Sequence, residues 1–226
     1  MNPIKLTTLL TLLLTGCGAG GAAEPVTWPN PVTSAATADS LLVDIADIDP
    51  SIRIDARYRD SGNFTGAPLP GYEANRLLLR REAAAALARV QRRLGERGLG
   101  LLVWDAYRPV RATTAMVEWA ERTGQVNLLD EGYIARRSGH NLGIAIDLTA
   151  VDLASGRPLD MGTPYDTFGA EAHTANATGD AARNRAVLVE VMEAEGFDNY
   201  DQEWWHFSYP LDDPVPFDIP VTETAP

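Results

Sequence analysis

Residues 143–149 read Gly143-Ile144-Ala145-Ile146-Asp147-Leu148-Thr149, and this stretch decides the class of fold. Apolar side chains recur at every second position, which predicts a strand with one apolar face. The opposite face carries Asp147, a carboxylate that is costly to bury unless a cation meets it. The stretch therefore predicts a buried strand that carries a functional group.

Helices and strands are interleaved irregularly along the rest of the chain. Apolar residues at helical spacing predict helices over residues 80–98, 110–123 and 181–195. Short apolar or aromatic runs predict further strands over residues 101–104 and 203–209. This irregular order favours a single α+β domain over a doubly wound parallel sheet.

The composition is that of a folded, acidic protein. A chain of 226 residues with 45% hydrophobic side chains can bury a core without disulfides. Its 19 basic and 31 acidic residues give a net charge of −12, which repels phosphate backbones, so we expect no nucleic-acid partner. The single cysteine, Cys17, excludes an internal disulfide, a cysteine-rich zinc site and an iron–sulfur cluster.

Residues 1–16 have the pattern of a lipoprotein signal peptide. Lys5 supplies a positive charge, and the apolar run after it is too short to span a bilayer. Residues 14–17, Leu-Thr-Gly-Cys, resemble the bacterial lipobox, in which the cysteine is acylated and becomes the new N-terminus. We therefore expect an exported bacterial lipoprotein, anchored through Cys17 to the periplasmic or extracytoplasmic face of a membrane. An ordinary signal cleaved near residue 22 is the alternative.

Two segments lack the spacing of apolar residues that is typical of a helix or strand. Residues 17–40 are rich in Gly, Ala, Pro and Thr, which predicts a flexible tether. Residues 219–226 are expected to form a loose tail. The folded domain is therefore expected over residues 41–218.

Two of the three histidines lie in dense motifs. His140 precedes the strand that carries Asp147, and His206 ends the run Glu203-Trp204-Trp205-His206. Two imidazoles and one carboxylate would form a three-ligand zinc site with an open fourth position, as catalytic sites do. Glu203 lies three residues before His206 and would act as a general base.

Spacing alone leaves other interpretations open. A histidine beside a strand is often a hydrogen-bonded core residue, and Asp147 could pair with an arginine instead of a metal. The His-Glu-x-x-His signature of common zinc proteases is absent. His173 lies in a polar loop, where we expect it to support the site from outside or to lie at the surface. Trp204 and Trp205 are expected to be wall and core residues.

Several motifs, taken in chain order, resemble one family. They are Ser138-Gly139-His140-Asn141-Leu142-Gly143 with Asp147, and also Asn63-Phe64-Thr65-Gly66, Gly71-Tyr72-Glu73-Ala74-Asn75-Arg76, Trp104-Asp105-Ala106-Tyr107-Arg108-Pro109, Met161-Gly162-Thr163-Pro164-Tyr165-Asp166 and Glu203-Trp204-Trp205-His206. Together they resemble the D-alanyl-D-alanine dipeptidases of the VanX type, from about residue 43 to residue 217. The resemblance implies an α+β domain with a central antiparallel sheet flanked by helices.

The resemblance also implies the chemistry of the site. It implies one zinc ion per chain bound by His140, Asp147 and His206, with Glu203 as the catalytic acid and base. Arg108 is the implied electrophile near the scissile carbonyl.

The substrate pocket is implied in the same way. Asp166 would hold the free ammonium of the substrate, with Tyr58 and Ser138 nearby. Gly139 and residues 141–142 depart from the serine-rich and basic residues of that family's loop, which bears on substrate preference.

The implied activity is zinc-dependent hydrolysis of the free dipeptide D-alanyl-D-alanine, in cell-wall peptide metabolism or glycopeptide resistance. Two alternatives remain open. One is a D,D- or L,D-carboxypeptidase that acts on longer peptidoglycan peptides. The other is a non-catalytic lipoprotein that binds wall fragments, against which an intact Glu203 and Arg108 argue.

Overall fold

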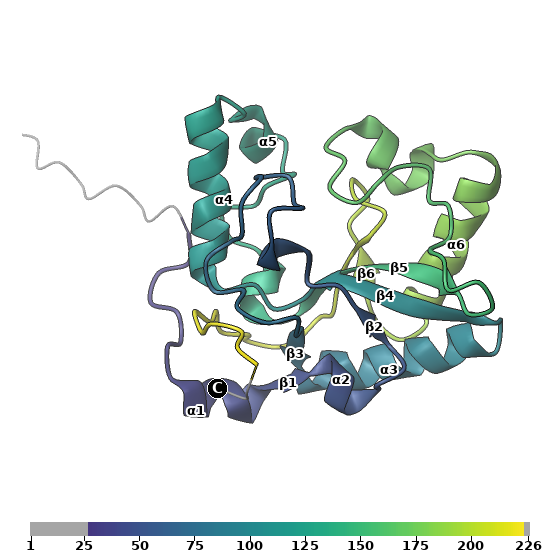
Figure 1. Ribbon diagram of the computed structural model, residues 1–226, viewed down its shortest axis with the longest axis horizontal. Helices are drawn as coiled ribbons and strands as arrows, with labels where there is room; N and C mark the ends of the chain where they lie inside the picture. Colours follow the sequence, from purple (N-terminus) through teal and green to yellow (C-terminus); the bar gives the residue numbers. More distant parts are fainter. Residues whose placement is uncertain (1–26, 224–226) are drawn as a thin grey trace, which may run out of the picture.

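A five-stranded sheet runs through the centre of the computed structural model, which describes residues 27–223 (Figure 1). The strands lie in the order β2-β4-β5-β7-β6. Their bounds are β2 Arg53–Ile54, β4 Leu99–Asp105, β5 Ala145–Asp152, β7 His206–Ser208 and β6 Asp198–Asn199. β2 runs parallel to β4, whereas the other neighbours are antiparallel. The α+β class is confirmed, and the expected sheet is antiparallel except for β2.

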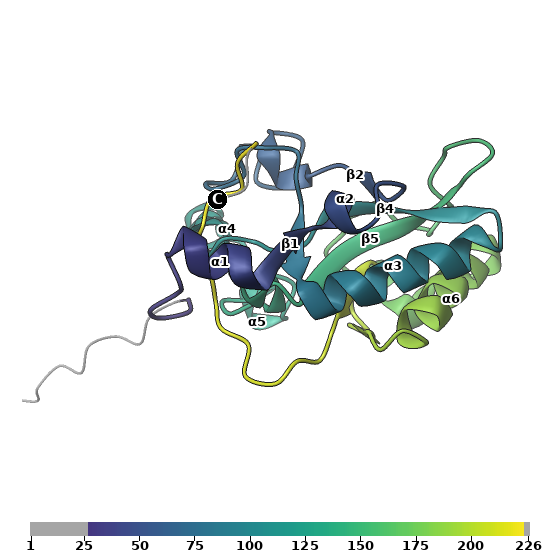
Figure 2. The ribbon, with the colours of Figure 1, turned by 90° about the horizontal axis from the view of Figure 1, so that it is seen from below.

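A second, two-stranded sheet and the helices surround this centre. The small sheet pairs β1 Leu42–Asp44 with β3 Leu78–Arg80. The α-helices are α1 Ala35–Leu41, α2 Ile45–Ile48, α3 Arg81–Gly95, α4 Val110–Thr123, α5 Asn127–Asp130 and α6 Gly179–Glu193. Short 3-10 turns are η1 Arg57–Arg59, η2 Gly139–Leu142, η3 Ala170–Ala172 and η4 Thr174–Asn176. Figure 2 shows α3 and α6 packed side by side beneath β4 and β5.

The three helices expected from periodicity are confirmed. In α3, the stripe of Ala83, Leu87, Val90 and Leu94 is completely buried against the sheet. Such a stripe is what an amphipathic helix uses to cover a sheet face. The spacing of these apolar residues in the sequence therefore correctly predicts which face of α3 is buried.

The aromatic stretch 203–209 only partly forms a strand. β7 begins at His206, because the preceding residues form a turn in which the His206 N–H donates to the Glu203 carbonyl at 3.1 Å. The Glu203 N–H in turn donates to the Tyr200 carbonyl at 3.0 Å. The turn keeps the Glu203 side chain close to that of His206.

Both irregular segments are packed against the domain where the structure describes them, which differs from what composition alone suggests. Within the expected tether, α1 forms and Ala38 is fully buried. Within the expected tail, Ile219 and Val221 are buried, and the Val221 N–H donates to the Gly71 carbonyl at 2.8 Å. Apolar side chains in both segments find partners that composition alone does not reveal. The expected signal peptide and Cys17 lie outside the described residues.

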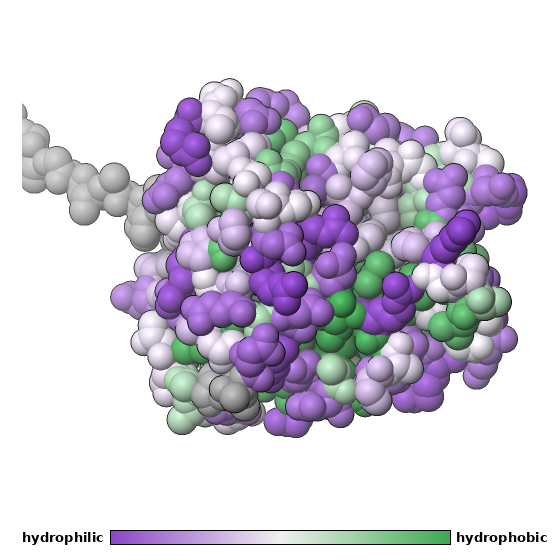
Figure 3. Space-filling model, in the orientation of Figure 1, coloured by the Kyte–Doolittle hydropathy of each residue, from purple (hydrophilic) through white to green (hydrophobic). Residues whose placement is uncertain are grey.

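The surface is mixed in polarity. Figure 3 shows a face covered largely by hydrophilic side chains, with apolar side chains gathered in small areas. None of the helices within residues 27–223 has the length and apolar character that a bilayer crossing requires.

Candidate active site

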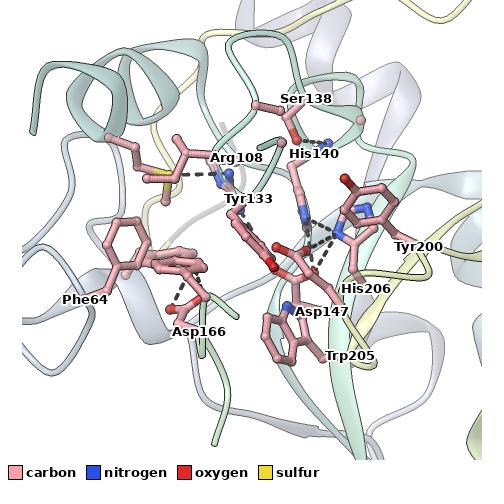
Figure 4. A pocket seen from close by; sticks show the side chains of 18 of the residues that line it. Phe64, Arg108, Tyr133, Ser138, His140, Asp147, Asp166, Tyr200, Trp205 and His206 are labelled. Carbon is pink, nitrogen blue, oxygen red and sulfur yellow. Dashed lines mark hydrogen bonds and ion pairs between the residues drawn. The ribbon is translucent and has the colours of Figure 1, made fainter. Parts of the chain in front are cut away.

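Three side chains that could hold a metal ion converge at one end of the central sheet (Figure 4). Asp147 of β5 stands directly opposite His206 of β7 in the strand register, and His140 comes from η2. Asp147 Oδ1 lies 2.9 Å from His206 Nδ1 and 3.3 Å from His140 Nε2. The two imidazole nitrogens are 3.2 Å apart. The structure thus brings the three expected ligands together.

The loop that carries His140 is held rigidly by its own sequence. The Ser138 hydroxyl accepts a hydrogen bond from the His140 N–H at 3.2 Å, while the Asn141 side chain accepts one from the Ser138 N–H at 3.2 Å. This reciprocal cap fixes the start of η2. Gly143 ends the turn with φ of 68°, and a Cβ atom there would lie 2.6 Å from Leu42. Only glycine fits this position without strain.

The donor set fits a zinc ion. His140 Nδ1 lies 2.7 Å from the Ala106 carbonyl, to which it donates, so Nε2 presents its lone pair to the other two donors. Burial opposes ionisation of Asp147, but the adjacent His140 and His206 favour it and hold the pKa of Asp147 well below its usual range. Two imidazoles and one ionised carboxylate are a donor set typical of catalytic zinc.

Glu203 lies beside this group without belonging to it. Its Oε2 atom is 3.8 Å from His206 Nδ1, and the residue is buried. Burial, with the nearby charges of Asp147 and Asp166, raises the pKa of Glu203 well above its usual value. A buried carboxylate with a raised pKa is suited to taking up and returning a proton.

Arg108 is held by a carboxylate to which the sequence analysis assigned no role. Asp105, completely buried at the end of β4, accepts from Arg108 at 2.7 and 3.0 Å and from the Tyr72 hydroxyl at 2.5 Å. Arg108 Nη2 also lies 3.9 Å from Asp147 Oδ2. Burial disfavours the charged form of Arg108, but the negative charge of Asp105, together with the other groups around the guanidinium, has the larger effect. The pKa of Arg108 is therefore raised above its ordinary value. The sequence signal was a carboxylate ending a buried strand, three residues before an arginine.

A second buried carboxylate lies across the cavity. Asp166 accepts from the Tyr58 hydroxyl at 3.1 and 3.2 Å, and Tyr58 lies 3.0 Å from the Tyr165 hydroxyl. Tyr165, which also lacked an assigned role, donates to Asp147 at 2.9 Å. Burial and the charge of Asp147 raise the pKa of Asp166 to about 8. Asp166 also has φ of 59°, a conformation uncommon outside glycine and often found at functional positions.

The eight side chains expected to take part in metal binding, catalysis or substrate binding all line one cavity of about 270 Å³. They are Tyr58, Arg108, Ser138, His140, Asp147, Asp166, Glu203 and His206. His173 is outside the set of described residues that line the cavity. Its Nε2 atom lies 3.0 Å from the hydroxyl of Tyr133, and Tyr133 does line the cavity. Trp204 and Trp205 are both buried, as expected.

Comparison with known proteins identifies the family. A family model described as D-ala-D-ala dipeptidase matches residues 38–222. The chain is 37% identical over 189 residues to a D-alanyl-D-alanine dipeptidase of Enterococcus faecium, a match that covers 75% of this chain and 93% of that protein. It is 37% identical over 188 residues to a D-alanyl-D-alanine dipeptidase of Streptomyces coelicolor, with the same coverage. For the protein of that name from Escherichia coli, the identity is 35% over 171 residues, covering 75% and 84%. The chain therefore belongs to the D-alanyl-D-alanine dipeptidase family of metallopeptidases.

Proposed function

We propose that this metallopeptidase hydrolyses the free dipeptide D-alanyl-D-alanine and uses one zinc ion per chain. The observation that carries the proposal is a single small cavity that combines three metal donors, a buried base, a buried cation and a second buried carboxylate. Relatives that share more than a third of their residues with the chain bear the name of this activity. This hydrolysis would serve cell-wall peptide metabolism or glycopeptide resistance.

The chemistry is divided among the side chains. Zinc held by His140, Asp147 and His206 would acidify water and polarise a carbonyl group. Glu203 accepts the proton of the attacking water and returns it to the departing amine, which its raised pKa favours. Arg108 stabilises the negative charge that grows on the carbonyl oxygen, since its guanidinium is fixed in place by Asp105 before reaction.

The residues that line the cavity around Asp166 would determine which substrates bind. Asp166 and Tyr58 offer a carboxylate and a hydroxyl to the free ammonium of a dipeptide. An N-acetylated substrate would leave the buried Asp166 without a charged partner, a costly arrangement. The proposal therefore requires discrimination against blocked N-termini.

Hydrolysis assays with the zinc-loaded protein test this function. The substrates are D,D-, L,D- and L,L-dipeptides, N-acetyl-D-Ala-D-Ala and longer peptides that end in D-Ala-D-Ala. We expect turnover of free D-Ala-D-Ala and little of its acetylated form. Faster cleavage of the longer peptides would contradict the proposal and identify a carboxypeptidase. Binding of wall fragments without turnover would identify a non-catalytic protein.

A matched variant tests the base. Glu203→Gln keeps the shape of the side chain but removes its proton acceptor, so we expect retained zinc and a kcat lowered by about 100- to 10,000-fold. Elemental analysis and steady-state kinetics measure the two quantities. Asp201→Asn, the same carboxylate-to-amide change at an exposed position of the same turn, is the control and should leave kcat nearly unchanged. Wild-type turnover in Glu203→Gln would remove Glu203 from this role.

We also propose that the chain is exported and anchored as a lipoprotein. Lys5, the apolar run after it and the lipobox-like residues 14–17 support the proposal. Fractionation of cells that express the wild type and Cys17→Ser tests it. The wild type should sediment with membranes and the variant should not. A wild-type protein recovered without lipid and free of membranes would refute the anchor.

A further inference from the structure

The carboxylate of Asp147 has different neighbours at its two oxygens. Oδ1 lies 2.9 Å from His206 Nδ1 and 3.3 Å from His140 Nε2, so this oxygen faces the other two metal donors. Oδ2 accepts a hydrogen bond from the Tyr165 hydroxyl at 2.9 Å. One oxygen of Asp147 is therefore turned toward the metal site, and the other is bound by Tyr165.

The ring of Tyr165 is fixed by the side chains around it. Tyr165 is buried, and its ring stacks on that of Trp104, with the centroids 4.7 Å apart and the planes inclined by 23°. Trp205 contacts the same ring edge-on, with the centroids 5.4 Å apart. The Tyr165 hydroxyl also lies 3.0 Å from that of Tyr58, but an ionised carboxylate is the stronger acceptor, so Tyr165 donates its proton to Asp147. The packing of the ring therefore sets the direction of this hydrogen bond.

Arg108 is a competing partner for the same oxygen of Asp147. Its Nη2 atom lies 3.9 Å from Oδ2, which is beyond hydrogen-bond distance, and the guanidinium donates to Asp105 instead. Without the Tyr165 hydroxyl, the buried Oδ2 atom would lose a donor, which is costly for a charged oxygen. Rotation of the carboxylate toward Arg108 would replace that donor and would turn Oδ1 away from the two imidazoles.

We propose that Tyr165 is a positioning residue that keeps Asp147 turned toward the metal and apart from Arg108. The inference rests on the proposed function, because it takes zinc as the metal of the site. Tyr165 is outside the set of described residues that line the cavity, so it acts through Asp147 and not by contact with the substrate. Hydrogen-bonded partners of this kind orient metal ligands and raise metal affinity.

The zinc affinity of Tyr165→Phe tests the proposal without any turnover. The change removes the hydroxyl but keeps the ring between Trp104 and Trp205, so we expect the fold to be retained. Competition with a chelator of known affinity measures the dissociation constant of zinc for the full chain. We expect this constant to rise about 10- to 100-fold, the usual result of losing a partner of a metal ligand.

The visible spectrum of bound Co²⁺ gives a second readout, which a merely structural role of Tyr165 would not change. This spectrum depends on which atoms bind the ion and on their arrangement. We expect the absorption bands of Tyr165→Phe to shift from those of the wild type, because Asp147 no longer presents its carboxylate in the same orientation.

Tyr133→Phe is the matched control. It removes the same hydroxyl from a tyrosine that lines the cavity, but this hydroxyl lies against His173, 3.0 Å from its Nε2 atom. It should keep the wild-type zinc affinity and Co²⁺ spectrum. Wild-type values in Tyr165→Phe, or equal changes in Tyr133→Phe, would overturn the inference. A wild type that binds zinc without hydrolysing D-Ala-D-Ala would overturn the proposed function alone, whereas one that binds no zinc would overturn both.

Discussion

Asp166 does not titrate like an ordinary aspartate. Its pKa is raised to about 8 by burial and by the charge of Asp147, yet the proposed role requires its ionised form. The ammonium of a dipeptide loses its proton near pH 8. Binding therefore requires an ionised Asp166 and a protonated ligand at the same pH.

This conflict predicts a bell-shaped pH dependence of binding. In zinc-free Glu203→Gln protein, where no ion offsets the charge of Asp147 and no turnover is expected, affinity for D-Ala-D-Ala should be greatest near pH 8. It should fall on the acid side as Asp166 takes up a proton and on the alkaline side as the ligand amine loses one. Isothermal titration calorimetry measures the profile. Adding Asp166→Asn should abolish the acid limb, and an acid limb that persists would assign it to another group.

Among the secondary-structure elements, α3 and α6 pack side by side beneath β4 and β5 of the central sheet. Glu195, just after α6, pairs with Arg89 and Arg93 of α3. The Glu195 side chain is only 8% exposed, whereas the two arginines are about half exposed. The hydrogen bonds from Arg89 and Arg93 lower the pKa of Glu195 from its ordinary value of 4.5. These two ion pairs therefore connect the end of α6 to α3.

The sign of this shift predicts how stability changes with pH. A carboxylate with a lowered pKa stabilises the folded state fully above its ordinary pKa of 4.5, and this contribution is lost as pH falls through the lowered value. Glu195→Gln should therefore reduce the free energy of unfolding by about 1 kcal/mol at pH 7, and by less below pH 4. Urea unfolding at both pH values measures this. Glu193→Gln, an exposed change in α6, is the control. A difference that is constant with pH would contradict the charge argument.

For the molecule as a whole, the last described residues join parts of the chain that are distant in sequence. The Phe217 N–H donates to the Asn141 carbonyl at 2.9 Å, and its carbonyl accepts from Val110 at 3.1 Å. The Tyr107 hydroxyl donates to Ile219 at 2.9 Å and accepts from it at 2.7 Å. This segment therefore ties the loop before α4, which carries Arg108, to the loop that carries His140.

Removing the central side chain of this segment should destabilise the whole domain. Phe217 is completely buried, so Phe217→Ala should lower the free energy of unfolding by about 3–5 kcal/mol. Val215→Ala, two residues away at a 39% exposed position, should change it little. Chemical denaturation of both variants measures the difference. A cost below about 1 kcal/mol for Phe217→Ala would show that the segment is not part of the cooperative unit.

The sequence by itself determined the elements whose signals are local. The helix α4 was expected over residues 110–123 and forms over the same range, and the strand around Asp147 was visible from alternation. Motif spacing and family resemblance singled out eight residues for the expected site, and all eight line one cavity. Periodicity and turn residues act over a few positions, so one sequence suffices to recognise them.

The tertiary structure alone decided which distant segments meet. Tyr107 and Ile219 are separated by 112 residues, and the Trp28 indole and the Ser138 carbonyl by 110. Neither pair leaves a periodic signal, and composition alone predicted a tether and a tail where the chain is packed. Asp105 acquired its role in the same way, since its partner Tyr72 arrives from another loop. Burial and charge pairing depend on the three-dimensional neighbours of a residue, and these exist only once the sheet has brought the loops together.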